Sequence, residues 1–160
     1  GVPHDVRGGL PDPDAADGCF YANLSAPVRL ITALLPRLRA RPKAAIINVT
    51  SGLAIAPNTG SSVYCASKAG LVNMTKAMAM EYVKKNIRIN AVAPGGMFTN
   101  IATGITMPQD ADFELIARFS GLRGMVEVAD VAEAIAMLAS PAGRSYHGSC
   151  LTIDAGITAG

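Results

Sequence analysis

The 160 residues of this chain are half apolar and carry 14 basic and 12 acidic side chains, for a net charge of +2. Because the charges are balanced and no run of like charge occurs, the sequence argues against a protein that binds nucleic acid or an anionic membrane surface. Apolar stretches such as residues 30–35 are far shorter than the ~20 residues that span a bilayer, and there is no targeting core at the start. We therefore expect a cytoplasmic protein with no membrane segment, and the three scattered cysteines suggest neither a disulfide framework nor a metal site.

The first part of the chain is expected to be an irregular arm followed by a helix and a strand. Residues 1–18 contain three prolines, four glycines and four aspartates and show no periodicity. Apolar residues at three- and four-residue steps predict a helix from about residue 20 to 39, interrupted at Pro27. The β-branched run AAIINVTS, residues 44–51, predicts a strand buried on both faces, and residues 51–62 read as a loop.

A long helix from about Ser62 to Lys85 is the strongest secondary-structure signal in the chain. It starts at a serine cap, has an apolar face that includes Leu71 and Met74, and ends at two lysines that suit its negative end. Asn86 is expected to stop it in a left-handed conformation.

The second half of the chain alternates strands and helices. IRINAVA predicts a buried strand that closes at the turn Pro94-Gly95-Gly96, and a flexible segment then runs to about Gln109. Helices are predicted over residues 112–119 and 128–139, and a last strand over SCLTID, residues 149–154. Strands that alternate with long helices imply an α/β fold with a parallel sheet.

Chemistry is suggested by four polar residues at particular spacings. Tyr64 and Lys68 are four residues apart on the long helix; Ser51 ends a predicted strand, and Asn23 lies 28 residues before it. The Tyr-Lys pair alone is weak, since a snorkelling lysine on a capped helix explains it as well. Ser51 and the Pro94-Gly95 turn, however, both fall at carboxyl ends of strands, where ligands collect in open α/β sheets.

These residues carry a family resemblance. The segments NVTSGLAIAPNTGSSVYCASKAGLVNMTKAMAMEY, IRINAVAPGGMFT and GSCLTIDAG resemble the short-chain dehydrogenase/reductase superfamily, in the branch similar to 3-oxoacyl-carrier-protein reductases. The match runs from about Asp17 to Gly156. The resemblance implies a Rossmann-type fold, NAD or NADP as cofactor, and a small carbonyl or alcohol substrate that is reduced or oxidised. It also implies a homo-dimer or tetramer, formed through the helices near 20–39 and 62–85.

The chemistry expected of such a site assigns a role to each polar residue. Tyr64 would be the general acid and base, and the Lys68 cation one turn away would lower the pKa of the phenol. The Ser51 hydroxyl would orient the substrate oxygen. In the family pattern the carbonyl of Asn23 binds a water that continues a proton path through Lys68. Since Pro27 has no N–H to occupy that carbonyl, it would leave the carbonyl free for the water.

Further residues are assigned to the cofactor and the substrate by the resemblance. Pro94, Gly95 and Thr99 match the element that lines the nicotinamide, with Tyr64 and Lys68 completing the cofactor contacts. Ser51, Gly96 and Met97 would face the substrate, beneath a covering loop from Gly96 to Gln109. No metal is expected.

One part of the family pattern is missing from this sequence. It contains no T-G-x-x-x-G-x-G turn and no residue that would choose between NAD and NADP. We therefore expect an amino-terminally truncated chain: a single partial domain over residues 1–160, the carboxyl-terminal portion of a doubly wound sheet, with its catalytic and substrate side in residues 19–156. The open edge of the strand at 44–51 and the helix faces would then be exposed. The alternative is a catalytically inactive fragment that serves as an oligomerisation or regulatory module.

Overall fold

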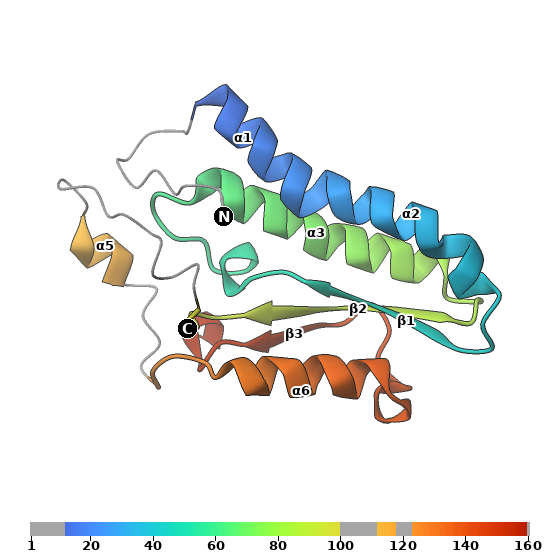
Figure 1. Ribbon diagram of the computed structural model, residues 1–160. Helices are drawn as coiled ribbons and strands as arrows, with labels where there is room; N and C mark the ends of the chain where they lie inside the picture. The colour runs from blue at the N-terminus through green and yellow to red at the C-terminus, as the bar shows by residue number, and fades with distance from the viewer. Residues whose placement is uncertain (1–11, 100–111, 118–122, 160) are drawn as a thin grey trace.

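A computed structural model describes residues 12–99, 112–117 and 123–159, and its centre is a three-stranded parallel sheet (Figure 1). The strand order is β1 (Ala44–Val49), β2 (Ile87–Pro94), β3 (Cys150–Ile153). Ala44 pairs with Ile87 in the first ladder, and Ala91 pairs with Cys150 in the second. The predicted strands and the α/β class with a parallel sheet are confirmed.

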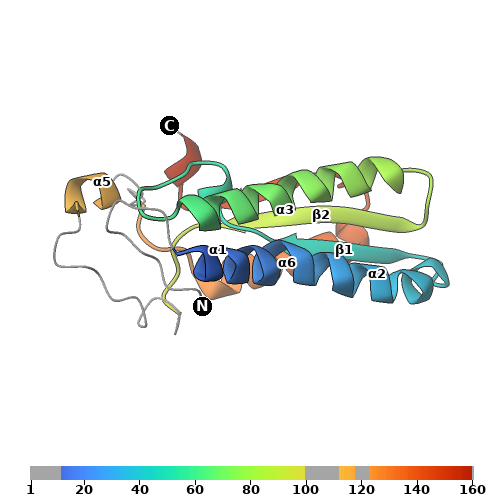
Figure 2. The same ribbon diagram turned by 90° about the horizontal axis from the view of Figure 1, so that it is seen from above.

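Helices cover both faces of this sheet. Figures 1 and 2 show α1 (Pro13–Phe20), α2 (Ala26–Arg39) and α3 (Ser62–Glu81) on one face and α6 (Val128–Ala139) on the other. A short helix, α5 (Phe113–Ala117), lies beyond the carboxyl ends of the strands. The remaining turns are η1 (Tyr21–Ser25), η2 (Gly52–Ala54), η3 (Pro141–Gly143) and η4 (Ile157–Ala159).

The helical part of the chain begins earlier than predicted. The predicted irregular arm over residues 1–18 is wrong from Pro13 onward, because α1 starts there; residues 1–11 lie outside the described residues. The Asp12 carboxylate accepts hydrogen bonds from the backbone N–H groups of Asp14 and Ala15, at 2.9 and 3.4 Å. An acidic cap followed by proline at the first helical position is a strong start signal, which the proline-rich composition had obscured.

The predicted interruption at Pro27 is a turn of π-helix. In η1 the Ala26 N–H donates to the carbonyl of Tyr21, one residue farther back than in an α-helix. Because Pro27 has no N–H, the Asn23 carbonyl lacks the donor that an α-helix would supply. The chain therefore stays helical from Pro13 to Arg39, with one irregular turn around Asn23.

The end of α3 differs from the prediction. The helix stops at Glu81, four residues before Lys85, and Asn86 is not its left-handed stop, since Ala155 is the one non-glycine residue with positive φ in the described part of the chain. The Asn86 amide instead donates to carbonyls at the end of α2, those of Leu38, Arg39 and Arg41. At the other end Ser61 occupies the cap position, but its side chain makes no capping hydrogen bond.

The core lies between the sheet and helices α2 and α3. Its buried cluster comprises Ile31, Ile46, Ala79, Tyr82, Ile87 and Ile89. The central strand β2 is buried almost throughout, whereas β1 is only partly buried and its last residue, Val49, is 46% exposed. The prediction that β1 is buried on both faces is therefore wrong: a groove of about 550 Å³ runs between β1, α2 and the start of α3.

In the described part of the chain, the first helices carry several exposed apolar side chains. They are Phe20, Tyr21, Val28, Leu30 and Leu34, of which Leu30 and Leu34 also line the groove. By length and composition alone, the stretch Pro13–Arg39 could also cross a membrane. It contains an 18-residue window with a mean hydropathy of 1.2, and 11% of that window is buried. Core helices and signal sequences meet the same criterion, so a single such stretch is weak support for a span. Together with the groove, this surface agrees with the expected open edge of β1 and exposed helix faces.

The end of α6 is held to β2 by Arg88. Its guanidinium donates to the carbonyls of Leu138 at 2.7 Å, Gly143 at 2.8 Å and Ser140 at 3.2 Å. These carbonyls lie at the carboxyl end of a helix, where backbone acceptors have no partner within the helix. One side chain thus joins the central strand to the helix on the far face.

Replacement of Arg88 by methionine should destabilise the fold by about 1–3 kcal/mol, because several buried carbonyls would lose a charged donor. Chemical denaturation measures this loss. Arg144→Met is the control, since Arg144 is exposed and its side chain has no partner among the described residues. Equal stability losses in both variants would contradict this role of Arg88.

Candidate functional site

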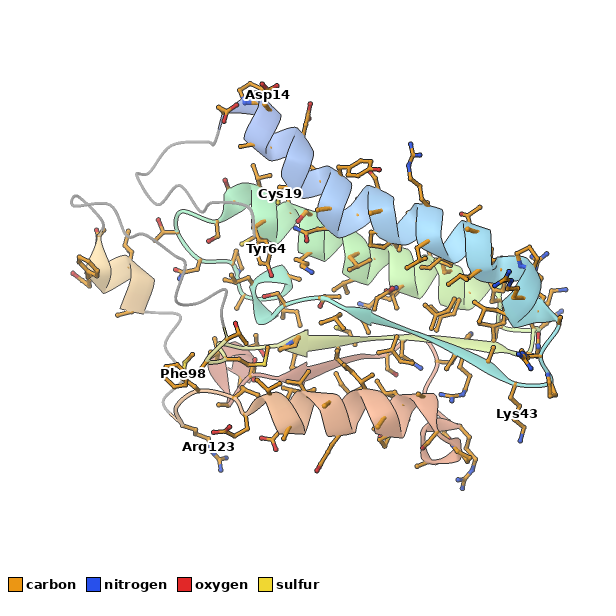
Figure 3. All side chains as sticks on the ribbon, viewed as in Figure 1. Asp14, Cys19, Lys43, Tyr64, Phe98 and Arg123 are labelled. Carbon is orange, nitrogen blue, oxygen red and sulfur yellow. The ribbon has the colours of Figure 1, made fainter. Side chains whose placement is uncertain are left out.

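The three strands end side by side, and the candidate site lies at this edge. Beyond β1, the Thr50 N–H donates to the carbonyl of Val92 at 2.8 Å, and beyond β2 the Gly95 N–H donates to the carbonyl of Ile153 at 2.9 Å. The residues that follow each strand are therefore neighbours. In Figure 3 the labelled Tyr64 and Phe98 lie at this end of the molecule.

Tyr64 and Ser51 are brought together across the loop between β1 and α3. Tyr64 is the third residue of α3, and its phenol forms a side-chain hydrogen bond with Ser51. Ser51 is extended, with φ −160° and ψ 152°, and its hydroxyl also accepts a hydrogen bond from the Leu53 N–H at 3.2 Å. The serine hydroxyl is thus oriented by the backbone of η2 and faces the phenol, which is the arrangement that the sequence predicts for orienting an oxygen.

Lys68 lies one turn along α3 from Tyr64. Its Nζ is 5.8 Å from the centroid of the Tyr64 ring and donates to the carbonyl of Val49 at 3.1 Å. This bond ties the ammonium group to the last residue of β1. Lys68 also lines the groove beside β1, and Asn23 lines the same groove from the helical side.

The electrostatics of the pair differ from the prediction. Burial raises the pKa of Tyr64 above its usual 10.0, although the hydrogen bond from Ser51 acts to lower it. Burial also lowers the pKa of Lys68 from its usual 10.5. The predicted depression of the phenol pKa by the lysine is therefore wrong for this chain, because desolvation penalises both charged forms and the ammonium group points to Val49. At neutral pH the phenol holds its proton.

Asn23 is joined to the turn that carries Tyr64 by its side chain. Its Nδ2 donates to Ser67 Oγ at 3.1 Å and approaches Cys19 Sγ at 3.3 Å. Asn23, Ser51, Tyr64 and Lys68 thus gather around the first turns of α3. A water on the Asn23 carbonyl stays a prediction.

The residues assigned to the cofactor and substrate follow β2. A Cβ on Gly95 would lie 2.8 Å from the Cα of Asp154, so no side chain fits there. Pro94 ends the central strand, and the Gly96 carbonyl accepts from the Val126 N–H at 2.9 Å. Met97 and Thr99 are half-buried beside the same edge, while residues 100–109 of the predicted covering loop lie outside the described residues.

These residues fit one end of a nicotinamide cofactor. The phenol and the ammonium group supply donors for hydroxyls, whereas Gly95 is required by its packing against Asp154. The chain has no T-G-x-x-x-G-x-G turn that would hold a pyrophosphate. The described residues thus suit the nicotinamide and its ribose.

Two residues of this edge were missed by the sequence analysis. Ser67 is fully buried and donates to the Tyr64 carbonyl at 2.8 Å; a hydroxyl three residues after a helical tyrosine was the only sequence signal for it. The Asp154 carboxylate accepts from the Gly156 N–H at 3.0 Å and the Thr158 N–H at 2.9 Å. It stabilises the turn against which Gly95 packs, and the sequence DAG at a strand end was its signal.

Comparison with known proteins places the chain among reductases and dehydrogenases. A family model described as enoyl-(acyl carrier protein) reductase matches residues 12–158. The 7alpha-hydroxysteroid dehydrogenase of Bacteroides fragilis is 36% identical over 150 residues, which cover 92% of this chain and 56% of that protein. The 3-oxoacyl-[acyl-carrier-protein] reductase of Rickettsia bellii is 36% identical over 143 residues, or 88% and 57% of the two chains.

Solved structures agree with the sequence relatives. The crystal structure of 3-ketoacyl-(acyl-carrier-protein) reductase from Brucella melitensis, complexed with NADH, matches with a TM-score of 0.86 and 27% identity, covering 99% of this chain and 64% of that one. A 4-hydroxyisoleucine dehydrogenase complexed with NADH matches with a TM-score of 0.79 and 28% identity over 100% and 65% of the two chains. The chain spans a little more than half the length of the relatives from Bacteroides fragilis and Rickettsia bellii.

Loss of the Asp154 charge should change how stability depends on pH. Burial acts to raise its pKa, but hydrogen bonds from Thr158 and Gly156 outweigh that effect and hold the pKa below the usual 3.8. A carboxylate with a depressed pKa stabilises the fold above about pH 3.8, and this stability is lost as the pH falls through its folded pKa.

Asp154→Asn should therefore melt at a lower temperature than the unmodified protein at neutral pH, and the two melting temperatures should converge as the pH falls below 3.8. Calorimetric melting curves across this range measure the difference. Glu133→Gln, at an exposed position of α6, is the control and should leave it unchanged. A gap between Asp154→Asn and the unmodified protein that stays constant with pH would refute this account.

Proposed function

Because the chain belongs to the short-chain dehydrogenase/reductase superfamily, we propose that it carries the catalytic side of an NAD(P)-dependent oxidoreductase that interconverts a ketone and a secondary alcohol. The observation that supports this most directly is the meeting of Ser51, Tyr64 and Lys68 at the carboxyl edge of the sheet. A phenol, a hydroxyl that bonds it and a nearby cation are the groups that protonation of a carbonyl oxygen requires.

The proton transfer follows from the protonation states of the site. The cofactor, when bound, supplies or accepts a hydride. Tyr64 is protonated at neutral pH, since its pKa lies above the usual 10.0, so a proton is available for the oxygen of a substrate that becomes an alcohol. Ser51 bonds the phenol and can bond the same substrate oxygen, which aligns the two groups.

Lys68 is proposed to stabilise Tyr64 after it has given up its proton. In the chain as described, the ammonium group bonds the Val49 carbonyl and lies 5.8 Å from the ring centroid. A closer approach of this charge to the phenol oxygen would favour a phenolate, and the lowered pKa of Lys68 also eases passage of a proton through its amine. The groove that both Lys68 and Asn23 line offers a route from this amine to water.

The substrate class is proposed from the relatives and the apolar residues near the site. Met97 is half-buried, and Phe98, 82% exposed, stands beside it at the strand ends. Apolar side chains beside polar groups suit a hydrophobic molecule with one carbonyl or hydroxyl. We take the hydroxysteroid and the 3-oxoacyl thioester named by the relatives as the first probes, with NAD and NADP both open. We also propose that copies of this chain assemble with one another through α2 and α3, and that the protein is located in the cytoplasm.

A second candidate function is a non-catalytic module that pairs with related chains. It is favoured by the exposed apolar side chains of α1 and α2 and by the open groove along β1. The retained constellation around Tyr64 argues against it, since packing alone has no use for a half-buried phenol that bonds a serine.

Tyr64→Phe should lower kcat by about 100-fold or more in the full-length protein, because the proton donor is lost while the ring is kept. NADH or NADPH oxidation with a 3-oxoacyl thioester or an oxosteroid measures this. Tyr146→Phe, at a position outside the site and 37% exposed, is the matched control and should retain full turnover. Unchanged turnover in Tyr64→Phe would end the proposed mechanism.

The two candidate functions separate in a calorimetric titration of the protein with NADH. The oxidoreductase predicts saturable binding that Lys68→Met weakens, because the amine is a proposed cofactor contact. The non-catalytic module predicts no heat of NADH binding in the unmodified protein or in Lys68→Met. It also predicts a dimer that persists without NADH.

A further inference from the structure

We propose that Ser67 is a positioning residue that holds the peptide of Tyr64, and with it the phenol, in place by linking it to Asn23. The importance of this link for turnover rests on the proposed role of Tyr64 as acid and base. The link itself is a matter of hydrogen bonding within this chain, and it can be tested without cofactor or substrate.

The link is a directed chain of two hydrogen bonds. The single hydroxyl proton of Ser67 goes to the Tyr64 carbonyl at 2.8 Å, so the serine oxygen is left to accept from Asn23 Nδ2 at 3.1 Å. Ser67 is 0% exposed, and its third neighbour is Cys19 Sγ at 3.7 Å. Because Ser67 itself is fully buried, loss of its hydroxyl would leave the Tyr64 carbonyl without this donor and with no ready access to solvent.

The link reaches the first turn of α3. Ser61 gives the helix no side-chain cap, so the backbone N–H groups of this turn receive no side-chain acceptor from the cap position, and Tyr64 is the third residue of the helix. The bond from Ser67 reaches the carbonyl of the same residue that carries the phenol. The donor at the other end, Asn23, lies in the π-helical turn on a separate helix, so the link also sets where that turn sits against α3.

A second tie of the same chemistry occurs farther along α3. Asn48 Nδ2 donates to Thr75 Oγ1 at 2.8 Å, and Thr75 donates to the Leu71 carbonyl at 2.8 Å. Thr75 is 1% exposed, so it is as buried as Ser67. This tie joins α3 to β1 about three turns from Tyr64, whereas the Ser67 tie joins α3 to the helix before it. Variants that break one tie or the other therefore distinguish an effect on the position of the phenol from an effect on the stability of the helix.

The test follows the titration of Tyr64 itself. The protein is labelled with carbon-13 at tyrosine Cζ, whose chemical shift reports the protonation state of each phenol, and Tyr64→Phe identifies the signal. The variants are Ser67→Ala, which breaks both bonds; Ser67→Thr, which keeps the hydroxyl; and Thr75→Val, which breaks the matched tie. Melting temperature is measured for each, so that loss of stability is known separately.

Ser67→Ala should bring the pKa of Tyr64 down towards the usual 10.0, because a phenol that is no longer held in its buried position gains solvent. Ser67→Thr should restore the original titration. Thr75→Val should lower the melting temperature and leave the titration of Tyr64 unchanged. In the complete enzyme, Ser67→Ala should lower kcat by about tenfold with little change in KM, the effect expected when a catalytic group is displaced by a fraction of an ångström.

Two results would overturn the proposal. One is a Ser67→Ala protein that melts lower but titrates like the unmodified protein, which would make Ser67 a structural residue only. The other is a Thr75→Val protein that shifts the titration equally, which would make the effect general to α3. If Ser67→Ala does not fold, Asn23→Ala removes the donor of the same link and should shift Tyr64 in the same direction; an unchanged titration there counts equally against the link.

The titration of Tyr64 can be interpreted even if the enzyme proves inactive. The proposed function fails if the complete polypeptide neither binds NADH nor turns over a carbonyl substrate, and that result does not affect the titration of Tyr64. A normal titration in Ser67→Ala, with turnover that still depends on Tyr64, would refute the positioning role and keep the proposed function.

Discussion

The site depends on how α3 is held against the sheet. Two buried hydroxyls on this helix, Ser67 and Thr75, each receive a hydrogen bond from an asparagine on another element and pass one on to a carbonyl of α3. Since a buried donor without an acceptor is costly, these ties allow few alternative placements of the helix. Apolar packing alone is less directional. One of these ties reaches the residue that carries the phenol, and the other, at Thr75, holds the helix farther along its length.

Burial of the site has opposite consequences for its two titratable groups. It raises the pKa of Tyr64 and lowers that of Lys68, so both groups are pushed towards their neutral forms. A phenol with a raised pKa keeps its proton at neutral pH but is a weaker acid, whereas an amine with a lowered pKa gives up its proton more easily. Proton donation by Tyr64 therefore requires stabilisation of the phenolate, for which the ammonium group would have to act more strongly than it does beside Val49.

Periodicity and turn chemistry predicted most of the fold from the sequence. The strands at Ala44, Ile87 and Cys150 and the helix over Val128–Ala139 were predicted because β-branched runs and apolar steps are local signals. The start of α1 was missed, since its cap lies within a proline-rich stretch that resembles a loop. The grouping of Asn23 with Ser51 and Tyr64 was predicted by family resemblance. The hydrogen bond between Asn23 and Ser67 joins residues that are 44 positions apart, and no local sequence pattern predicts such a contact.

The open edge of β1 and the acid–base site are connected through Lys68. Its ammonium group bonds the carbonyl of Val49, the exposed last residue of that strand, and its side chain lines the groove beside it. A polypeptide that paired with β1 would remove water from this groove and so lower the pKa of Lys68 further, unless it brought a negative charge. It would also compete for the strand's polar groups and could release the ammonium group towards Tyr64. Whatever covers β1 therefore acts on the protonation chemistry as well as on stability.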